Sequence, residues 1–403
     1  MHHPLHPRPQ PPQEQDKAGR HLIYPLKGSL QNYAWGSGSY IQELIGISTP
    51  EPLAELWLGA HHKAPARING QTLDAFLKAN PHLAGTSYSE EQPLPYLMKV
   101  LAAQKPLSIQ VHPNKDQALA GFERENKQGL PLDDPKRNYR DANHKLELIC
   151  ALTPFEAMCG FRAFDRIAEA LQTVGLSNEV AACRQFCAQP DPQSWKECFA
   201  ALLSLESVIL AQTLENIKRL DPSTWAREQA WIKRLTELYP QDCGVLAPLY
   251  LNLVQLQPLE ALFLDAGTPH AYLQGAGIEV MTASDNVLRA GLTSKHIDLC
   301  ELSKVLVFQP LDVEVLKLNS SSSALRFFSH GAHEFKLGYA PVNAASALDL
   351  RLDTPAIILC IEGRLNCLQK SSKIELRRGE AAFCDAGEQE MSIAGEGAFF
   401  VVM

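Results

Sequence analysis

Short runs of alternating apolar and polar residues dominate the chain from about residue 22, and this pattern predicts β-strands. The segments AELWLG at 54–59 and PYLMKVL at 95–101 are broken by Gly, Pro and Asn, as strands joined by turns are. The same pattern returns at Pro248 and continues beyond residue 310 to the final GAFFVVM. Tyr33 and Trp35 stand near the start of this region. Their rings fit either the core or the lining of a pocket, and we expect both in the core.

Between about 163 and 243 the apolar residues recur instead at the i, i+3, i+4, i+7 spacing of amphipathic helices. Phe164, Ile167 and Leu171 mark the first of these helices. Pro240 follows the last one, where a helix is expected to end. The outer faces are acidic and basic and show no obvious chemistry, so we interpret this block as a helical insertion in a β-rich protein.

Composition narrows the class of protein. With 403 residues, of which 45% are hydrophobic and 20% charged, the chain suits a globular protein of two or three domains. A net charge of −8 argues against a nucleic-acid-binding surface, and no apolar run reaches the roughly 18 residues of a membrane-spanning helix. Residues 1–20 are rich in Pro, Gln and His, which predicts a disordered tail. The ten cysteines are scattered without a CxxC pair, which favours free thiols in a reducing cytoplasm.

Two strand-like segments place polar side chains together on one face, because a strand alternates its faces with period two. Ser108, Gln110 and His112 share a face in KPLSIQVHPNK, and Pro113 then ends the strand because it has no N–H to donate. In NHKLELICAL the same alternation puts Lys145 and Glu147 on one face of a strand. Taken alone, each segment also fits an ordinary core histidine or a solvated face with a salt bridge.

Residues 265–296, DAGTPHAYLQGAGIEVMTASDNVLRAGLTSKH, place many ionisable groups on an apolar framework, which is typical of a functional site. Alternation puts His270 and Tyr272 on one face and pairs Glu279 with Met281 farther on. Two histidines, a carboxylate and an amide oxygen from these segments suit Zn²⁺, and the candidate ligands are Gln110, His112, Glu147 and His270. No histidine follows His333, so the last 70 residues cannot supply an imidazole to such a site.

The segments QNYAWG, AELWLGAH, LSIQVHPNK, NHKLEL, TPHAYLQG, and SDNVLRAGLT followed by Lys295 closely resemble type I mannose-6-phosphate isomerases (phosphomannose isomerases). The resemblance runs from Leu22 to the C-terminus, in the same order and with similar spacing. It implies a mainly β fold of two cupin (jelly-roll) β-barrels, the second degenerate, with an α-helical insertion. The implied division is a tail at 1–20, a catalytic cupin domain at 21–162 and 244–310, a helical insertion at 163–243 and a C-terminal cupin-like domain at 311–403.

The resemblance also implies roles for single residues. One Zn²⁺ per chain would be held by Gln110, His112, Glu147 and His270. Phosphate and sugar would be handled by Ser108, Lys145, Glu279, Asp285 and Arg289. We add Tyr272 and Lys295 as candidate substrate contacts, and a solvated Lys295 is the alternative. Arg289 is fork-shaped and always charged, so it suits a phosphate dianion, although a salt bridge to Asp285 is the alternative.

The implied reaction interconverts D-mannose 6-phosphate and D-fructose 6-phosphate by proton transfer through an enediol, within mannose metabolism and the supply of GDP-mannose precursors. Either Lys145 or Glu279 would move the proton between C1 and C2. Asp285 would help in ring opening, for which His144 is a further candidate.

Two other classes compete with this interpretation. A non-catalytic cupin that senses sugar phosphates would keep the metal ligands and lose the catalytic side chains. A cupin dioxygenase with Fe²⁺ would usually have more histidines and no glutamine ligand. We expect a sugar-phosphate substrate, no nucleic-acid or membrane partner, and a cytoplasmic monomer.

Overall fold

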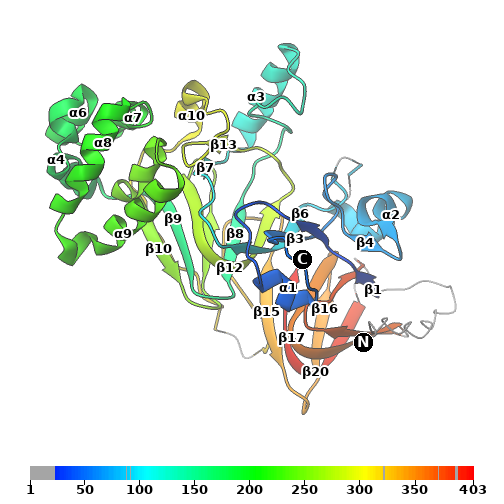
Figure 1. Cartoon of the computed structure of the whole chain (residues 1–403). Helices are drawn as coiled ribbons and strands as arrows, with labels where there is room; N and C mark the ends of the chain where they lie inside the picture. Colours follow the sequence, from blue (N-terminus) through cyan, green and yellow to red (C-terminus); the bar gives the residue numbers. More distant parts are fainter. Residues whose placement is uncertain (1–22, 88, 91, 321–322, 371, 386–388) are drawn as a thin grey trace.

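The computed structural model describes residues 23–403 except 88, 91, 321–322, 371 and 386–388, so the tail predicted at 1–20 lies outside the described residues. The strands form two large antiparallel sheets and one small hairpin. Most of the helical residues lie between β9 (Phe155–Phe161) and β10 (Leu251–Leu256) and gather at one end of the molecule, opposite the C-terminal strands (Figure 1). The structure therefore confirms a mainly β fold with a helical insertion.

The first sheet has ten strands, and the long strand β12 (His270–Thr282) lies at its centre. The first half of β12 pairs with β9 and meets β7 (Gln110–Val111), and its second half pairs with β6 (Tyr96–Ala103) and β8 (Glu147–Ala151). One strand thus brings together segments that are more than a hundred residues apart. The other strands of this sheet are β2 (Ser29–Gln31), β3 (Glu55–Leu58), β10, β11 (Ala261–Leu264) and β13 (Leu288–Arg289).

The second sheet has eight strands and is formed mainly by the C-terminal part of the chain. Its members are β1 (Ile23–Leu26), β14 (Arg326–Phe327), β15 (Leu337–Val342), β16 (Leu348–Leu352), β17 (Ala356–Gln369), β18 (Ser372–Arg377), β19 (Ala381–Cys384) and β20 (Gln389–Val402). Strand β1 pairs with β19, so the first described strand is part of this sheet. The domain boundaries and the degenerate second barrel stay predictions.

The two sheets share a core. Met98, Val100 and Ile278 from the first sheet and Ile357 and Phe400 from the second belong to one cluster of buried apolar side chains. A hydrogen bond also crosses between the sheets, because the Tyr96 hydroxyl donates to the Pro355 carbonyl at 2.7 Å. The C-terminal sheet therefore covers apolar surface of the first sheet and packs its remaining apolar side chains into a separate cluster.

The helical block confirms the periodicity in the sequence. Strands β9 and β10 pair from Phe161 with Leu251 onward, so the chain leaves and rejoins the sheet on neighbouring strands. The longest helix begins where Asp221 caps it through the Ser223 N–H and Pro222 supplies a preset φ at the first position. The helices are α4 (Phe164–Thr173), α5 (Leu176–Glu179), α6 (Ala181–Ala188), α7 (Pro192–Leu202), α8 (Ser207–Asn216) and α9 (Pro222–Leu238).

The segment at 105–118 differs from the strand that the alternation predicts. Only Gln110–Val111 forms a strand, and a helix, α3 (Lys115–Lys127), begins soon after Pro113. Asn114 starts this helix with a capping box, in which its side chain and that of Gln117 each accept from the other's backbone N–H at 2.9 Å. This local signal competes with the alternation and ends the strand early.

The remaining elements are short. They comprise α1 (Tyr40–Ile45), α2 (Leu73–Ala79), α10 (Leu299–Val305) and the hairpin of β4 (Arg67–Ile68) and β5 (Gln71–Thr72). Within the described ranges, no single helix has both the length and the apolar character needed to cross a membrane. One bent pair, Pro192–Leu202 with Ser207–Arg219, reaches that length and composition only when both helices are taken together.

Candidate metal centre and active site

A cavity of about 420 Å³ opens beside the central strands of the first sheet. The strand pairing explains its position, because His270 lies opposite Gln110 in β7, which in turn lies opposite Arg289 in β13. The predicted site residues that line this cavity are Ser108, Gln110, Lys145, Glu147, His270, Tyr272, Glu279, Arg289 and Lys295.

Three buried side chains form a cluster with metal-ligand geometry. His112 Nε2 lies 3.4 Å from Glu147 Oε1, and His270 Nε2 lies 3.4 Å from Glu147 Oε2. Two ligands of one tetrahedral Zn²⁺, with bonds of about 2.1 Å, are roughly 3.4 Å apart. The three side chains are at most 4% exposed, so solvent does not separate their ligand atoms. The cluster therefore fits a single small cation.

Hydrogen bonds at the Nδ1 atoms fix the tautomers of both imidazoles, His112 and His270. His112 Nδ1 lies 2.7 Å from the Asn286 carbonyl and His270 Nδ1 lies 3.0 Å from the Thr268 carbonyl. A carbonyl only accepts, so each ring must donate from Nδ1 and direct its Nε2 lone pair toward Glu147. His112 Nε2 is buried without a hydrogen-bond partner. This orphaned lone pair facing a carboxylate is satisfied if a metal ion lies between them.

The charges in the cluster also favour a cation. Burial, followed by the Lys145 ammonium, lowers the pKa of His112 to about 4, so this ring is neutral at pH 7. Burial alone would raise the pKa of Glu147, but Lys145, whose Nζ lies 2.7 Å from Oε1, and His112 hold it well below its usual range. Neutral imidazoles and an ionised carboxylate are the forms that bind a metal.

A second buried ion pair in the cavity was missed by the sequence analysis. Lys99 Nζ lies 2.7 Å from Glu279 Oε2 and 3.5 Å from Glu55 Oε1, and Lys99 also lies over the Trp57 ring at 5.2 Å. Burial would lower the pKa of Lys99, but Glu279 and Glu55 raise it, so the ammonium stays charged. The signal was present in PYLMKVL, because a lysine in an otherwise apolar strand is rarely buried without a partner.

The opposite part of the cavity lining is basic. Burial and the neighbouring Arg140 lower the pKa of Arg289, and Arg289 with Arg140 lowers that of Lys295. Among the described residues the Arg289 guanidinium has no hydrogen bond or ion pair, so the alternative of a salt bridge to Asp285 is not formed. A partly buried, unpaired guanidinium beside further cations is suited to a dianionic group. Arg140, which lines a second cavity and acts on these two groups through its charge, was not among the predicted site residues.

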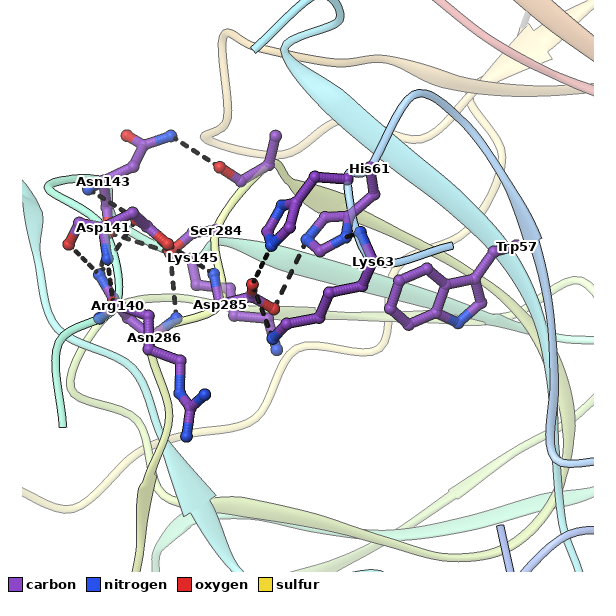
Figure 2. A network of polar contacts seen from close by, with 12 residues as sticks. Trp57, His61, Lys63, Arg140, Asp141, Asn143, Lys145, Ser284, Asp285 and Asn286 are labelled. Atoms are coloured by element: carbon purple, nitrogen blue, oxygen red, sulfur yellow. Dashed lines mark hydrogen bonds and ion pairs between the residues drawn. The ribbon is translucent and has the colours of Figure 1, made fainter. Parts of the chain in front are cut away.

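Two proposed helpers in ring opening lie apart from the cavity lining. Asp285 lines a second cavity, where its carboxylate faces His61 and Lys63 (Figure 2). His62 Nε2 lies 3.7 Å from the same carboxylate. His144 Nε2 lies 2.6 Å from Glu334 Oε1, so it is engaged by the C-terminal part of the chain. Their role in ring opening stays a prediction.

Tyr33 and Trp35, the two aromatic residues expected in the core, are both part of the cavity lining. Tyr33 is 43% exposed, and its ring stacks on Trp35 with centroids 5.6 Å apart. The core prediction is wrong for Tyr33, whereas Trp35 is partly buried and packs against a cluster of buried apolar side chains.

A mainly antiparallel β fold with a buried His–Glu–His cluster beside a polar cavity defines a class, the metal-dependent proteins of the cupin type. Comparisons with known proteins narrow this class. Residues 23–164 match the family model described as phosphomannose isomerase type I, catalytic domain.

Whole-chain relatives extend that match. The chain is 41% identical over 389 residues to the mannose-6-phosphate isomerase of Salmonella typhimurium, across 92% of this chain and 97% of the relative. It is 33% identical over 407 residues to that of Homo sapiens, across 91% and 94%. A crystal structure of mannose 6-phosphate isomerase bound with zinc and yttrium is similar with a TM-score of 0.87 and 38% identity, over 95% of this chain and 99% of that one. The chain belongs to the type I phosphomannose isomerase family.

Proposed function

We infer that this protein interconverts D-mannose 6-phosphate and D-fructose 6-phosphate as a zinc-dependent aldose–ketose isomerase. The observation that carries this function is the joint presence, at one cavity, of the His112–Glu147–His270 cluster and the unpaired Arg289 guanidinium. A sensor protein would need the phosphate site but not the buried ionisable groups Lys145 and Glu279. Their presence supports an enzyme of the family to which the chain belongs.

His112, Glu147, His270 and Gln110 would hold one Zn²⁺. Two neutral imidazoles, a neutral amide and one carboxylate leave a site with a net charge of +1, which favours anionic oxygens. What the ion supplies when bound is Lewis-acid polarisation of substrate oxygens. The protein's share is to hold these ligands in place, with Asn286 and Thr268 orienting the two imidazoles from behind.

Arg289 would bind the phosphate of the substrate, with Lys295 and Ser108 beside it in the cavity lining. Holding the dianion at this end orients the sugar along the cavity toward Glu147 and His270, and Tyr272 closes that wall. Fixing the reacting carbons relative to the catalytic groups converts binding energy into orientation.

Lys145 or Glu279 would carry the proton between C1 and C2. Both line the cavity, and each is held by a neighbour, Lys145 by Glu147 at 2.7 Å and Glu279 by Lys99 at 2.7 Å. The two candidates separate by experiment. Lys145→Met should retain zinc and lose exchange of the C2 proton with solvent if Lys145 is the base, and Glu279→Gln should do so if Glu279 is the base. Near-normal turnover in the zinc-loaded Lys145→Met enzyme would remove Lys145 from the role.

We further propose that the enzyme is a cytoplasmic monomer with no nucleic-acid or membrane partner. All ten cysteines are free thiols, as expected in a reducing compartment. The most exposed large apolar side chains, Leu132, Val208 and Val307, lie on separate segments, and this scatter supports a monomer.

A coupled assay on mannose 6-phosphate tests the function. Turnover should disappear with a strong chelator, return with added Zn²⁺, and be absent in His112→Ala. Turnover that is insensitive both to the chelator and to the loss of His112 would contradict the zinc assignment. No turnover of mannose 6-phosphate by the zinc-loaded enzyme would contradict the reaction itself.

A further inference from the structure

A second group of possible metal ligands lies outside the active-site cavity. His61 and His62 follow β3, and Asp285 lies in the loop between β12 and β13. All three line a separate cavity of about 490 Å³. Figure 2 shows the Asp285 carboxylate between His61 and Lys63. The isomerase reaction assigns no role to either histidine.

The distances between ligand atoms in this cluster are slightly longer than those in the His112–Glu147–His270 cluster. His61 Nε2 lies 3.5 Å from Asp285 Oδ1, and His62 Nε2 lies 3.7 Å from Asp285 Oδ2. These separations are long for hydrogen bonds but close to the roughly 3.4 Å between two ligands of a tetrahedral Zn²⁺. The three ligand atoms all lie within 4.8 Å of one another, and the imidazole rings stack with centroids 4.6 Å apart. One ion can therefore reach all three groups.

The three side chains differ in their exposure to solvent, and this difference gives the cluster an accessible side. The His62 side chain is 72% exposed whereas the other two are 6% and 17% exposed, so the site has two fixed ligands and one open side.

The carboxylate is also held in position from behind. The Asp285 N–H donates to Asp141 Oδ2 at 2.7 Å, and the Ser284 hydroxyl donates to Asp141 Oδ1 at 2.9 Å. Asn286, fully buried, donates to the Asp141 and Asn143 carbonyls at 2.9 and 2.8 Å (Figure 2). These bonds fix the loop backbone, and a preorganised ligand binds a metal with less loss of entropy.

Lys63 is the competitor for this site. Its Nζ lies 2.8 Å from Asp285 Oδ2, and its side chain is 45% exposed. Ion pairs that are this exposed are weak, because solvent screens them and a long side chain must be held in place. A divalent ion that gains two imidazoles as well as the carboxylate can displace the ammonium group.

We propose that His61, His62 and Asp285 form a second divalent-metal site, separate from the His112–Glu147–His270 cluster, in which a metal ion and the Lys63 ammonium are alternative partners of Asp285. Imidazole nitrogen with one carboxylate is a ligand set for Zn²⁺, Co²⁺ or Ni²⁺ rather than for Mg²⁺ or Ca²⁺. Zn²⁺ in excess of one ion per chain would occupy it.

The test titrates the full-length enzyme, loaded with one equivalent of Zn²⁺, with Co²⁺. Visible absorption of Co²⁺ and the metal content per chain are recorded, and zinc is measured in the same samples so that exchange at the first cluster is not counted. We expect the zinc-loaded wild type to bind one equivalent of Co²⁺, which is the second equivalent of metal per chain. His62→Ala should weaken it about tenfold or more, since even residues behind metal ligands contribute about 10–100-fold. Lys63→Met should strengthen it because the competing ammonium is removed.

The matched control is His82→Ala, which removes an exposed imidazole outside both clusters. This variant should bind the second equivalent of Co²⁺ as the wild type does. The histidines at positions 2, 3 and 6 are present in every variant, so any Co²⁺ that they bind is the same in all of them. His62→Ala should turn over mannose 6-phosphate as the wild type does. The proposal would be overturned if wild type, His62→Ala and His82→Ala bound the second equivalent of Co²⁺ with equal affinity. Weaker binding of this Co²⁺ in Lys63→Met than in the wild type would also overturn it. Failure of both the wild type and Lys63→Met to bind a second equivalent of metal in millimolar Co²⁺ would overturn it too.

Discussion

The two sheets are built alike but use their buried positions differently. Each is antiparallel, with long strands that pair with three or more partners, β12 in one and β17 and β20 in the other. The ten-stranded sheet buries charged groups, among them Lys99, Glu147 and Glu279. The described buried residues of β15 and β17 are apolar apart from Gln369.

This difference follows from the cost of burying charge. A buried charge is unfavourable unless it is paired or bound to an ion, so a sheet that only packs has no reason to keep one. The charges in the first sheet occur where the cavity is, and the second sheet covers apolar surface of the first. One sheet thus serves chemistry and the other stability, and four experiments test that division.

The largest effect is expected at the metal cluster. Glu147→Gln keeps the size of the side chain and removes its charge, so zinc affinity and activity should each fall by at least about a hundredfold. Glu375→Gln removes the same charge from β18 in the second sheet and should leave both unchanged. Zinc content after dialysis and the coupled assay provide the measurement. Similar losses in the two variants would break the comparison.

The next effect concerns the buried ion pair. Lys99→Met leaves Glu279 and Glu55 buried without their cation, which should lower the free energy of unfolding by about 3–5 kcal/mol. In the second sheet, Arg377→Met breaks an ion pair with Glu375 in which the arginine is 65% exposed, and should cost no more than about 1 kcal/mol. Urea unfolding of both variants measures this, and equal losses would contradict the contrast.

A core truncation in the second sheet should separate stability from chemistry. Leu365→Ala in β17 removes a fully buried side chain from the apolar cluster of that sheet and should lower the free energy of unfolding by about 2–5 kcal/mol. Below its unfolding transition, the variant should keep one zinc per chain and wild-type kcat. A stable Leu365→Ala protein with lost zinc would show that the second sheet shapes the metal site directly.

The smallest effect is a pH dependence. The folded-state pKa of Asp285 is lowered, so its stabilisation is fully present above its unfolded pKa of about 3.9 and is lost as pH falls below that value toward the folded pKa. The difference in unfolding free energy between wild type and Asp285→Asn should therefore be smaller at pH 3 than at pH 5. The exposed Asp349→Asn in β16 is the control and should change the unfolding free energy by no more than about 0.5 kcal/mol. An undiminished Asp285 difference at pH 3 would refute this.

Much of the site could be predicted because its pattern is local. Alternation placed Lys145 with Glu147 and His270 with Tyr272 on common faces, and all four line the cavity. Lys99 was not predicted as a site residue, because a single charged residue in an apolar run has no local partner in the sequence. Its partners, Glu55 and Glu279, lie 44 and 180 residues away.

The sequence by itself determined which side chains share a face of each strand and where helices replace strands, because period two and period 3.6 are properties of neighbouring residues. It did not determine which strands meet. Pairing of His270 with Gln110, and of Met281 with Glu147, depends on apolar packing between segments far apart in the chain. The meeting of His61 and His62 with Asp285 has the same origin. Only the tertiary structure decided these contacts, since strand register is set by the packing of whole faces rather than by any one segment.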